Sequence, residues 1–453
     1  MVDEVRITAL NILNTLDESR YQTLDTTFEA ALSKKTRFTK RDRAFLQTLV
    51  YGVLRWRARI DWVIAHFSKT HLDKVDPKVL NILRLAVFQI IYLSRIPTSA
   101  AVNTSVEMTK SFSAPWVAGY VNGLLRNVAK TSQHVSYPDM DKDPVSAIAV
   151  TKSFPKWLIK RWLDRFGLNE TASLCDAINT IPPITVRTNT LKTNRKDLAK
   201  LLEAYTDKIE ITEYSPDGIR FFRPKVSISE IKAFEHGLFQ VQDEAAQLVS
   251  FFLNPQPGET VLDACAGLGG KTGHIAQLMK NRGRLAALDK DNKKLFRLKA
   301  EMHRLGIRIV DTCTQDLNEP FAPDRYKPFD RILLDAPCSG LGVLRRHPDA
   351  KWDSAKQNLA YHHQRQAKML DNLAGLVKPS GVLVYSVCSM EPEENEHVIK
   401  GFLNKHKEFV IEERSMAPSL KTCRRLTNNG YLKTIPHLHR MDGFSSVCLR
   451  RIK

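Results

Sequence analysis

The chain has 453 residues, of which 43% are hydrophobic and 26% charged, and this composition excludes an intrinsically disordered protein and predicts more than one folded domain. Lys and Arg outnumber Asp and Glu by 68 to 49, which gives a formal net charge of +19. No apolar run reaches the roughly 18 residues of a membrane-spanning helix, no basic-then-apolar leader opens the chain, and the seven cysteines lack C-x-x-C spacing. We therefore expect a cytoplasmic protein with no membrane segment, disulfide framework or metal site.

The excess positive charge is spread along the whole chain. It amounts to +6 in residues 1–150, +4 in 151–240 and +9 in 241–453. Such a distribution is compatible with a surface that binds nucleic acid and equally with charge that only keeps the protein soluble. Charge alone leaves both interpretations open.

Residues 1–135 are predicted to form an all-helical domain, because apolar side chains recur there at helical spacing. The repeating positions include Val5, Ala9, Ile12, Leu13, Leu16, Leu46, Leu49, Val53, Ile60 and Ile64. The segment Arg41–Arg59 carries five arginines interleaved with Tyr51 and Trp56. It is either a phosphate-binding face or a solvated helix surface.

Residues 136–153 are polar and interrupted by prolines, which predicts a linker. Residues 154–238 are predicted to form a small α+β module that binds RNA. Its expected helices are Lys156–Phe166 and Lys196–Ala204, and its expected strands are Ile184–Val186 and Ile219–Phe222.

From residue 239 to 453, strands alternate with helical stretches, as in an α/β domain whose parallel sheet is covered on both faces. The expected strands are Thr260–Ala264, Arg284–Leu288, Arg308–Cys313, Asp330–Leu334 and Gly381–Ser386. The residues with recognisable chemistry follow these strands.

A glycine-rich loop joins the first of these strands to the helix after it. It consists of Cys265, Ala266, Gly267, Leu268, Gly269, Gly270 and Lys271. Glycines at this position let the backbone approach a nucleotide-like cofactor, although they can also simply form a tight turn. The spacing matches neither G-x-x-x-x-G-K-[ST] nor G-x-G-x-x-G, which disfavours a nucleotide hydrolase or a dehydrogenase.

Three aspartates follow successive strands: Asp289, Asp316 and Asp335. Each alone could be a helix cap or a turn residue. Together they would repel a phosphate but tolerate a cationic sulfonium, which favours S-adenosylmethionine as the cofactor. Asp289 is placed to accept hydrogen bonds from ribose hydroxyls.

Two cysteines, Cys338 and Cys388, follow the fourth and fifth strands of this domain. A single cysteine there is usually a small buried residue. Two of them beside a cofactor loop favour chemistry such as methylation of cytosine carbon 5, which needs a thiolate that adds to carbon 6 and a base that later removes the carbon 5 proton. The residues alone do not decide which cysteine has which role.

Several motifs in order resemble the RsmB/Nop2/Sun family of RNA 5-methylcytosine methyltransferases. They are Cys265–Lys271, Leu334–Gly342, Arg345–Asp349 with Lys351-Trp352, Tyr385–Ser389 and Glu391–Asn395. The segment Asp42–Arg55 is similar to the RNA-binding antitermination factor NusB, a domain that bacterial members of the family fuse ahead of a Rossmann-like methyltransferase domain.

The resemblance implies a role for each matching residue. Cys388 would be the nucleophile, Cys338 would help to release the product, and Asp335 would contact both the base and the cofactor. The glycine loop would hold the methionine part of S-adenosylmethionine, with Asp289 at the ribose and Asp316 at the adenine.

This sequence departs from the family pattern at two places. Gly267-Leu268 replaces the usual Ala-Pro of the loop, which loosens the backbone, and Val387 replaces the usual Thr before the nucleophile, which removes a hydroxyl. We expect both to be tolerated.

The sequence thus predicts a monomeric methyltransferase that acts on carbon 5 of a cytosine in 16S ribosomal RNA. The alternatives are a non-catalytic RNA-binding or ribosome assembly factor, a methyltransferase for another RNA such as tRNA, and a DNA cytosine methyltransferase. A DNA enzyme would be expected to use a single Pro-Cys nucleophile, so Cys388 and the NusB-like segment argue against it.

Overall fold

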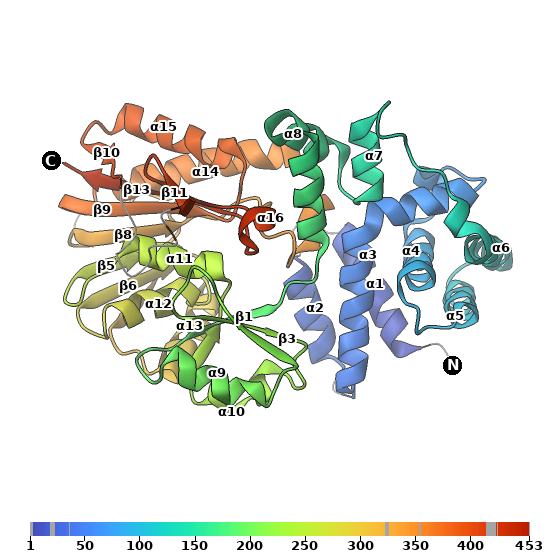
Figure 1. The fold of residues 1–453 in the computed structure, drawn as a ribbon, viewed down its shortest axis with the longest axis horizontal. Helices are drawn as coiled ribbons and strands as arrows, with labels where there is room; N and C mark the ends of the chain where they lie inside the picture. Colours follow the sequence, from blue (N-terminus) through green and yellow to red (C-terminus); the bar gives the residue numbers. More distant parts are fainter. Residues whose placement is uncertain are drawn as a thin grey trace. The chain divides into compact units, whose positions relative to one another are not determined.

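The computed structural model describes residues 3–18, 23–35, 37–321, 326–352, 355–413, 423 and 425–452. The chain forms two compact units (Figure 1). Unit 1 comprises Met1–Thr180 and His347–Asp353, and unit 2 comprises Ile181–Arg346 and Ser354–Lys453. No helix in the described part of the chain is both long enough and apolar enough to cross a membrane.

Unit 1 is helical, as predicted. Its helices are α1 (Glu4–Glu18), α2 (Leu24–Ser33), α3 (Lys40–Phe67), α4 (Pro77–Tyr92), α5 (Thr98–Lys110), α6 (Pro115–Thr131), α7 (Pro144–Thr151) and α8 (Lys156–Asn179). Thr39 and Asp42 form a capping box at the start of α3. Gly52 lets α3 approach α4, because a Cβ there would lie 2.0 Å from Cζ of Phe88.

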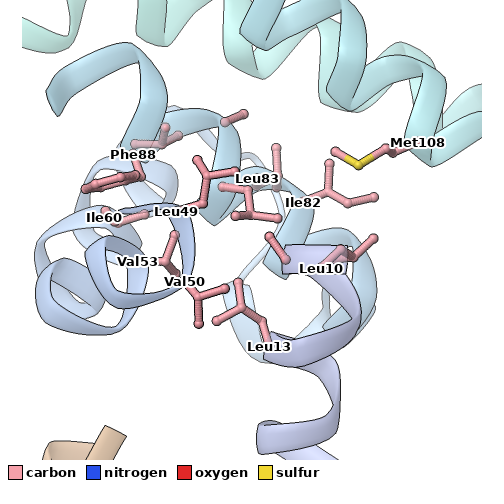
Figure 2. Packing of buried hydrophobic residues seen from close by; sticks show 14 of the residues in the cluster. Leu10, Leu13, Leu49, Val50, Val53, Ile60, Ile82, Leu83, Phe88 and Met108 are labelled. Carbon is pink, nitrogen blue, oxygen red and sulfur yellow. The ribbon is translucent and has the colours of Figure 1, made fainter. Parts of the chain in front are cut away.

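The core of unit 1 is built from the apolar positions that repeat along its helices (Figure 2). Leu49 and Val53 of α3 and Ile82 and Leu83 of α4 are almost completely buried. Leu13 of α1 joins them. The helical periodicity therefore identified the buried face correctly.

The predicted phosphate-binding face of α3 is not one surface. Arg41 and Arg43 are exposed, whereas Arg55 is buried. Arg57 forms an ion pair with Asp17 at 2.9 Å, and Arg59 lies over the rings of Trp56 and Tyr137. Arg55 faces the core because the helix is covered on that side, so neither a continuous phosphate-binding face nor a fully solvated one describes this segment.

The segment predicted as a linker is partly helical and buried. Helix α7 starts at the cap Asp143 and buries Ala147, Ile148 and Val150. Helix α8, with which the predicted α+β module begins, lies within the residues of unit 1. It runs past the predicted end at Phe166 through a kink at Gly167, whose φ is 75°.

A short segment from the second half of the sequence completes unit 1. It includes the 3-10 helix Pro348–Trp352. The fully buried Lys351 Nζ donates hydrogen bonds to Asn179 Oδ1 at 2.7 Å and to the carbonyls of Arg55 and Ser153, and Trp352 Nε1 donates to the Leu54 carbonyl. Burial lowers the pKa of Lys351 well below its usual value. These motif residues therefore have a structural role in unit 1.

Unit 2 begins with a small α+β module. Its antiparallel sheet has the order β2-β3-β1-β4. The strands are β1 (Ile184–Thr188), β2 (Lys208–Ile211), β3 (Gly218–Phe222) and β4 (Phe239–Val241), and the helices are α9 (Arg195–Glu203) and α10 (Lys232–Glu235). This agrees with the predicted α+β class.

The larger sheet of unit 2 has the order β11-β12-β13-β9-β8-β5-β6-β7, and β10 pairs with β13. Its parallel strands are β5 (Thr260–Asp263), β6 (Arg284–Asp289), β7 (Val310–Thr314), β8 (Phe329–Asp335) and β9 (Val377–Val387). Its antiparallel part comprises β10 (Phe409–Ile411), β11 (Thr427–Asn428), β12 (Tyr431–Thr434) and β13 (Phe444–Arg451). The sheet is therefore mixed, whereas only its parallel part was predicted from the sequence.

Helices cover both faces of this sheet (Figure 1). Apolar residues of α11 (Glu244–Leu253), α12 (Gly270–Leu278) and α13 (Asn292–Leu305) pack against Val261 and Leu333, and those of α14 (Ala355–Ala374) and α15 (Glu396–Lys405) pack against Leu262 and Leu334. A short helix, α16 (Pro436–His439), precedes β13. Because β5, β6, β8 and β9 are parallel, the loops after them meet at one edge of the sheet.

Candidate active site

The glycine-rich loop connects β5 to α12 as predicted. Gly267 and Gly269 have φ of 54° and 87°, in the left-handed region that favours glycine. A Cβ at Gly269 would lie 2.8 Å from Leu298 Cγ, whereas a Cβ at Gly267 would meet nothing within 4 Å. The loop therefore packs on α13 at one point and leaves its backbone open at another.

Asp289, at the end of β6, holds this loop. Its Oδ2 accepts a hydrogen bond from the Gly267 amide at 2.9 Å, and its Oδ1 accepts one from the Asp291 amide. Each carboxylate oxygen has a second acceptor site. Asp289 can therefore bind the loop and a hydroxyl at the same time.

Asp335, at the end of β8, pairs with the last residue of the glycine loop. Lys271 Nζ lies 2.6 Å from Asp335 Oδ2. Burial alone would lower the pKa of Lys271, but the charge of Asp335 and this hydrogen bond outweigh it and raise the pKa above its usual value. Lys271 therefore stays a cation inside the site.

The two candidate cysteines lie together. Cys338 follows β8 and Cys388 follows β9, and their Sγ atoms are 2.8 Å apart. Their loops are also joined through the backbone, because the Gly342 amide donates to the Cys388 carbonyl at 2.9 Å. The hydrogen bond to Cys388, together with burial, raises the pKa of Cys338 well above its usual value.

Of the remaining predicted site residues, Asp316 follows β7, and Cys265 and Leu268 lie in the glycine loop. Asp316 Oδ1 accepts hydrogen bonds from the backbone and side chain of Asn318, and the backbone bond keeps its pKa low. Asp316 thus shapes the turn after β7.

Within the glycine loop, burial raises the pKa of the Cys265 thiol, so Cys265 is not a ready nucleophile. Leu268 is about half exposed.

Val387 sits in the core. Its side chain is fully buried in the apolar cluster under α14 and α15. The hydroxyl of a Thr at this position would therefore lie among apolar side chains.

Two buried polar residues that were not predicted from the sequence support the loop. Asp263 is buried at the end of β5 and accepts a hydrogen bond from Thr272 Oγ1 at 2.6 Å, and burial raises its pKa to about 7. Arg187 of β1 donates to the Gly270 carbonyl at 2.8 Å, to Gln240 Oε1 at 2.9 Å and to Gln242. Asp263 could have been predicted, because an aspartate at the end of a buried strand is unusual. Nothing near Arg187 in the sequence indicated a contact with a loop 83 residues away.

Comparison with known families agrees with this architecture. The family model described as 16S rRNA methyltransferase RsmB/F matches residues 250–450. The NusB family model matches residues 3–130, and a model described as a Methyltr_RsmF/B-like, ferredoxin-like domain matches residues 154–229.

Individual proteins are similar over most of the chain. The Bacillus subtilis protein named "Probable ribosomal RNA small subunit methyltransferase B" is 35% identical over 99% of this chain and 98% of its own length. The Pseudomonas syringae pv. tomato protein named "Ribosomal RNA small subunit methyltransferase B" is 34% identical over 80% of this chain and 79% of its own. Among solved structures, NSun6 from Pyrococcus horikoshii with SFG is 25% identical, covers 67% of this chain and 99% of its own, and has a TM-score of 0.58.

Proposed function

The chain belongs to the 16S rRNA methyltransferase RsmB/F family, and we propose that it methylates carbon 5 of a cytosine in 16S ribosomal RNA with S-adenosylmethionine as the methyl donor. The methyltransferase activity on ribosomal RNA follows from the family. The choice of carbon 5 and the covalent route rest on the chemistry of the site.

The groups around the glycine loop fit S-adenosylmethionine. The open backbone at Gly267 is suited to the methionine part, Asp289 to the ribose hydroxyls, and Asp316 to the adenine side. NSun6 from Pyrococcus horikoshii was solved with SFG, an analogue of S-adenosylmethionine, which supports the same cofactor here. When bound, the cofactor supplies an electrophilic methyl group on a sulfonium.

The proposal rests above all on the pair of sulfurs, Cys338 Sγ and Cys388 Sγ, 2.8 Å apart beside the Lys271–Asp335 ion pair. Carbon 5 of cytosine is a poor nucleophile, and a thiolate added at carbon 6 makes it reactive. Removal of the carbon 5 proton then requires a base near the same ring. Two adjacent cysteines can supply both groups.

The surroundings favour Cys388 as the nucleophile. Lys271, a cation paired with Asp335 at 2.6 Å, interacts electrostatically with Cys388, and a neighbouring cation is the environment that suits a sulfur nucleophile. The pKa of Cys338 is raised, first by its bond to Cys388 and then by burial, which disfavours Cys338 as the attacking thiolate. In this assignment Cys388 is the sulfur that adds to carbon 6.

The remaining residues handle the charge and the proton. The Asp335 carboxyl, oriented by Lys271, is suited to hydrogen-bond the pyrimidine edge and support the charge that develops when Cys388 adds to carbon 6. The Cys338 thiol releases its proton to water once the methyl group is attached, the resulting thiolate accepts the carbon 5 proton, and Cys388 leaves carbon 6. The target base must be unpaired or flipped out, because carbon 6 is shielded inside a stacked helix.

Replacement of each cysteine tests the assignment. Cys388→Ala should abolish methyl transfer and adduct formation, whereas Cys338→Ala should form the covalent enzyme–RNA adduct but not release it. Denaturing gels with labelled 16S ribosomal RNA separate the adduct from free RNA. An adduct that accumulates with Cys388→Ala but not with Cys338→Ala would reverse the roles.

Two further measurements distinguish this function from the other candidate functions. Bisulfite sequencing of ribosomal RNA from a deletion strain should show the loss of one 5-methylcytosine. A 5-methylcytosine lost from tRNA instead would move the substrate to another RNA. No binding of S-adenosylmethionine at millimolar concentration, measured by calorimetry, would favour a non-catalytic assembly factor.

A further inference from the structure

The segment Glu391–Asn395 has no part in the cofactor site or the nucleophile pair described above. It follows Cys388 and contains the 3-10 helix Pro392–Glu394, directly before α15. Glu391 and Glu394 are nevertheless completely buried. Burial of carboxylates is costly, so their contacts indicate what the segment does.

The Glu394 carboxylate binds the loop that carries Cys338. Its Oε1 accepts a hydrogen bond from the Ser339 amide at 2.8 Å, and its Oε2 accepts one from Ser339 Oγ at 2.6 Å. Gln366 of α14 donates to the same carboxylate at 3.1 Å. Hydrogen bonds to an ionised acceptor are among the stronger ones in proteins.

Gln366 fixes the same loop from the other side of Cys338. Its Nε2 also donates to the Pro337 carbonyl at 3.0 Å. The residues immediately before and after Cys338 are therefore both held by the Glu394–Gln366 pair. The position of the Cys338 sulfur depends on that pair.

The segment holds the Cys388 loop as well. Asn395 Nδ2 donates to the carbonyls of Ser389 and Glu391, and the Glu391 amide donates to Ser389 Oγ at 3.2 Å. Tyr385, in β9, donates its hydroxyl to the Glu394 carbonyl at 2.6 Å. One short segment thus ties the two cysteine loops to each other.

We propose that Glu394 is a positioning residue for product release, which holds Cys338 against the base that Cys388 has attacked. This inference rests on the proposed function. The charge of Glu394 contributes too, because a buried carboxylate near Cys338 favours the Cys338 sulfur as a proton acceptor. Addition by Cys388 depends less on Glu394, since the Glu394 carboxylate binds Ser339 and Gln366, whereas Cys388 directly follows β9.

The step that Glu394 supports is the elimination. The Cys338 thiolate takes the proton from carbon 5, and the electrons of that C–H bond form the C5=C6 double bond. The C6–S bond breaks, and its electrons return to Cys388 as a thiolate. A displaced Cys338 would leave the methylated base attached to the enzyme.

Glu394→Gln tests this, because the side chain keeps its size but loses the charge and one of the acceptor oxygens. We expect the variant to form the methylated adduct in a single turnover within about 3-fold of the wild-type rate, while multiple turnover falls at least about 10-fold and the adduct accumulates on denaturing gels. Cys338→Ala serves as the reference for a trapped adduct. Glu393→Gln, the same change one residue earlier, should behave as the wild type.

A second measurement reports the position of the sulfurs without any RNA. Diamide oxidises two neighbouring thiols to a disulfide and is itself reduced to the hydrazine, so mass spectrometry can follow Cys338–Cys388 cross-linking. Glu394→Gln should slow the cross-linking at least about 5-fold relative to Glu393→Gln. Ser339→Ala, which removes one of the two hydrogen bonds, should show a smaller effect of the same kind if Glu394→Gln fails to fold.

The outcomes separate the two hypotheses. Unchanged cross-linking together with normal turnover in Glu394→Gln would overturn the positioning role, and so would a complete loss of adduct formation in a folded variant. No adduct with Cys338→Ala, combined with slower cross-linking in Glu394→Gln, would instead contradict the proposed reaction and leave Glu394 as a structural residue only.

Discussion

His274 of α12 should make unit 2 lose stability in acid. The imidazole is completely buried beside Arg187, with its Nε2 3.7 Å from Asp217 Oδ2 and its ring 4.7 Å from that of Phe251. Burial, and then the charge of Arg187, lowers its pKa from 6.5 to about 4. Between these two values the unfolded chain binds a proton that the folded chain does not, so stability falls as the pH falls from 6.5 to about 4.

The loss of stability follows from the difference between the pKa values of His274 in the unfolded and the folded chain. Each pKa unit corresponds to about 1.4 kcal/mol, so the His274 contribution lost by pH 4 is about 3 kcal/mol. Two buried acids act in the opposite direction, because burial raises the pKa of Asp263 to about 7 and that of Asp442 to about 6. They bind protons more tightly in the folded state and add stability as the pH falls, which masks the effect of His274 in the wild type.

The assay is therefore a comparison of His274→Gln with the wild type. Hydrogen exchange of β5 and β8 at increasing urea concentrations gives the free energy of unfolding of unit 2 at pH 7 and at pH 4. The difference between the variant and the wild type should shift by about 3 kcal/mol in favour of the variant at pH 4. A shift below about 1 kcal/mol would refute the reasoning.

The tryptophans provide an internal control. All six lie in unit 1: Trp56, Trp62, Trp116, Trp157, Trp162 and Trp352. Tryptophan fluorescence therefore reports unfolding of unit 1, which does not contain His274. The urea midpoint by fluorescence should be the same for both proteins at each pH.

Two further predictions concern the cofactor loop and the RNA. Arg187→Met should destabilise unit 2 by about 3 to 5 kcal/mol and weaken S-adenosylmethionine binding, because the Gln240, Gln242 and Gly270 oxygens lose the donor that the buried Arg187 supplies. An unchanged Kd by calorimetry would contradict a role in the loop. RNA affinity should fall about 1,000-fold between 50 and 200 mM salt if about six phosphates are neutralised, and a flat dependence would mean that the +19 charge serves solubility alone.

The spacing of apolar residues along the chain predicted most of the strands and helices that surround the site. Strands β5, β6 and β8 were predicted because short apolar runs alternate with helical stretches, and their order along the chain placed the glycine loop, Asp289 and Asp335 at one edge. The strand β7 begins two residues later than predicted, at Val310. Helix α7 was missed because Asp143-Pro144 reads equally well as a turn, although Asp143 caps the helix.

The remaining features depend on contacts between distant residues. Arg187 reaches Gly270, and Lys351 reaches Arg55 and Asn179, across large separations in sequence. Nothing in the local sequence distinguishes a buried lysine from a solvated one. The antiparallel strand β13 completes the sheet beside β9, and its pairing is likewise a tertiary property.

The roles of the two cysteines depend on their surroundings in the fold. Both follow a strand of the same sheet and both precede a serine, so the residues alone left their roles open. The structure gives them different neighbours: the Lys271 cation interacts with Cys388, and the loop of Cys338 is bound to the Glu394 carboxylate. A neighbouring cation suits a sulfur that attacks, and a neighbouring anion suits a sulfur that accepts a proton. On the proposed mechanism the two roles therefore come from the surrounding charges and from two loops whose sulfurs lie 2.8 Å apart.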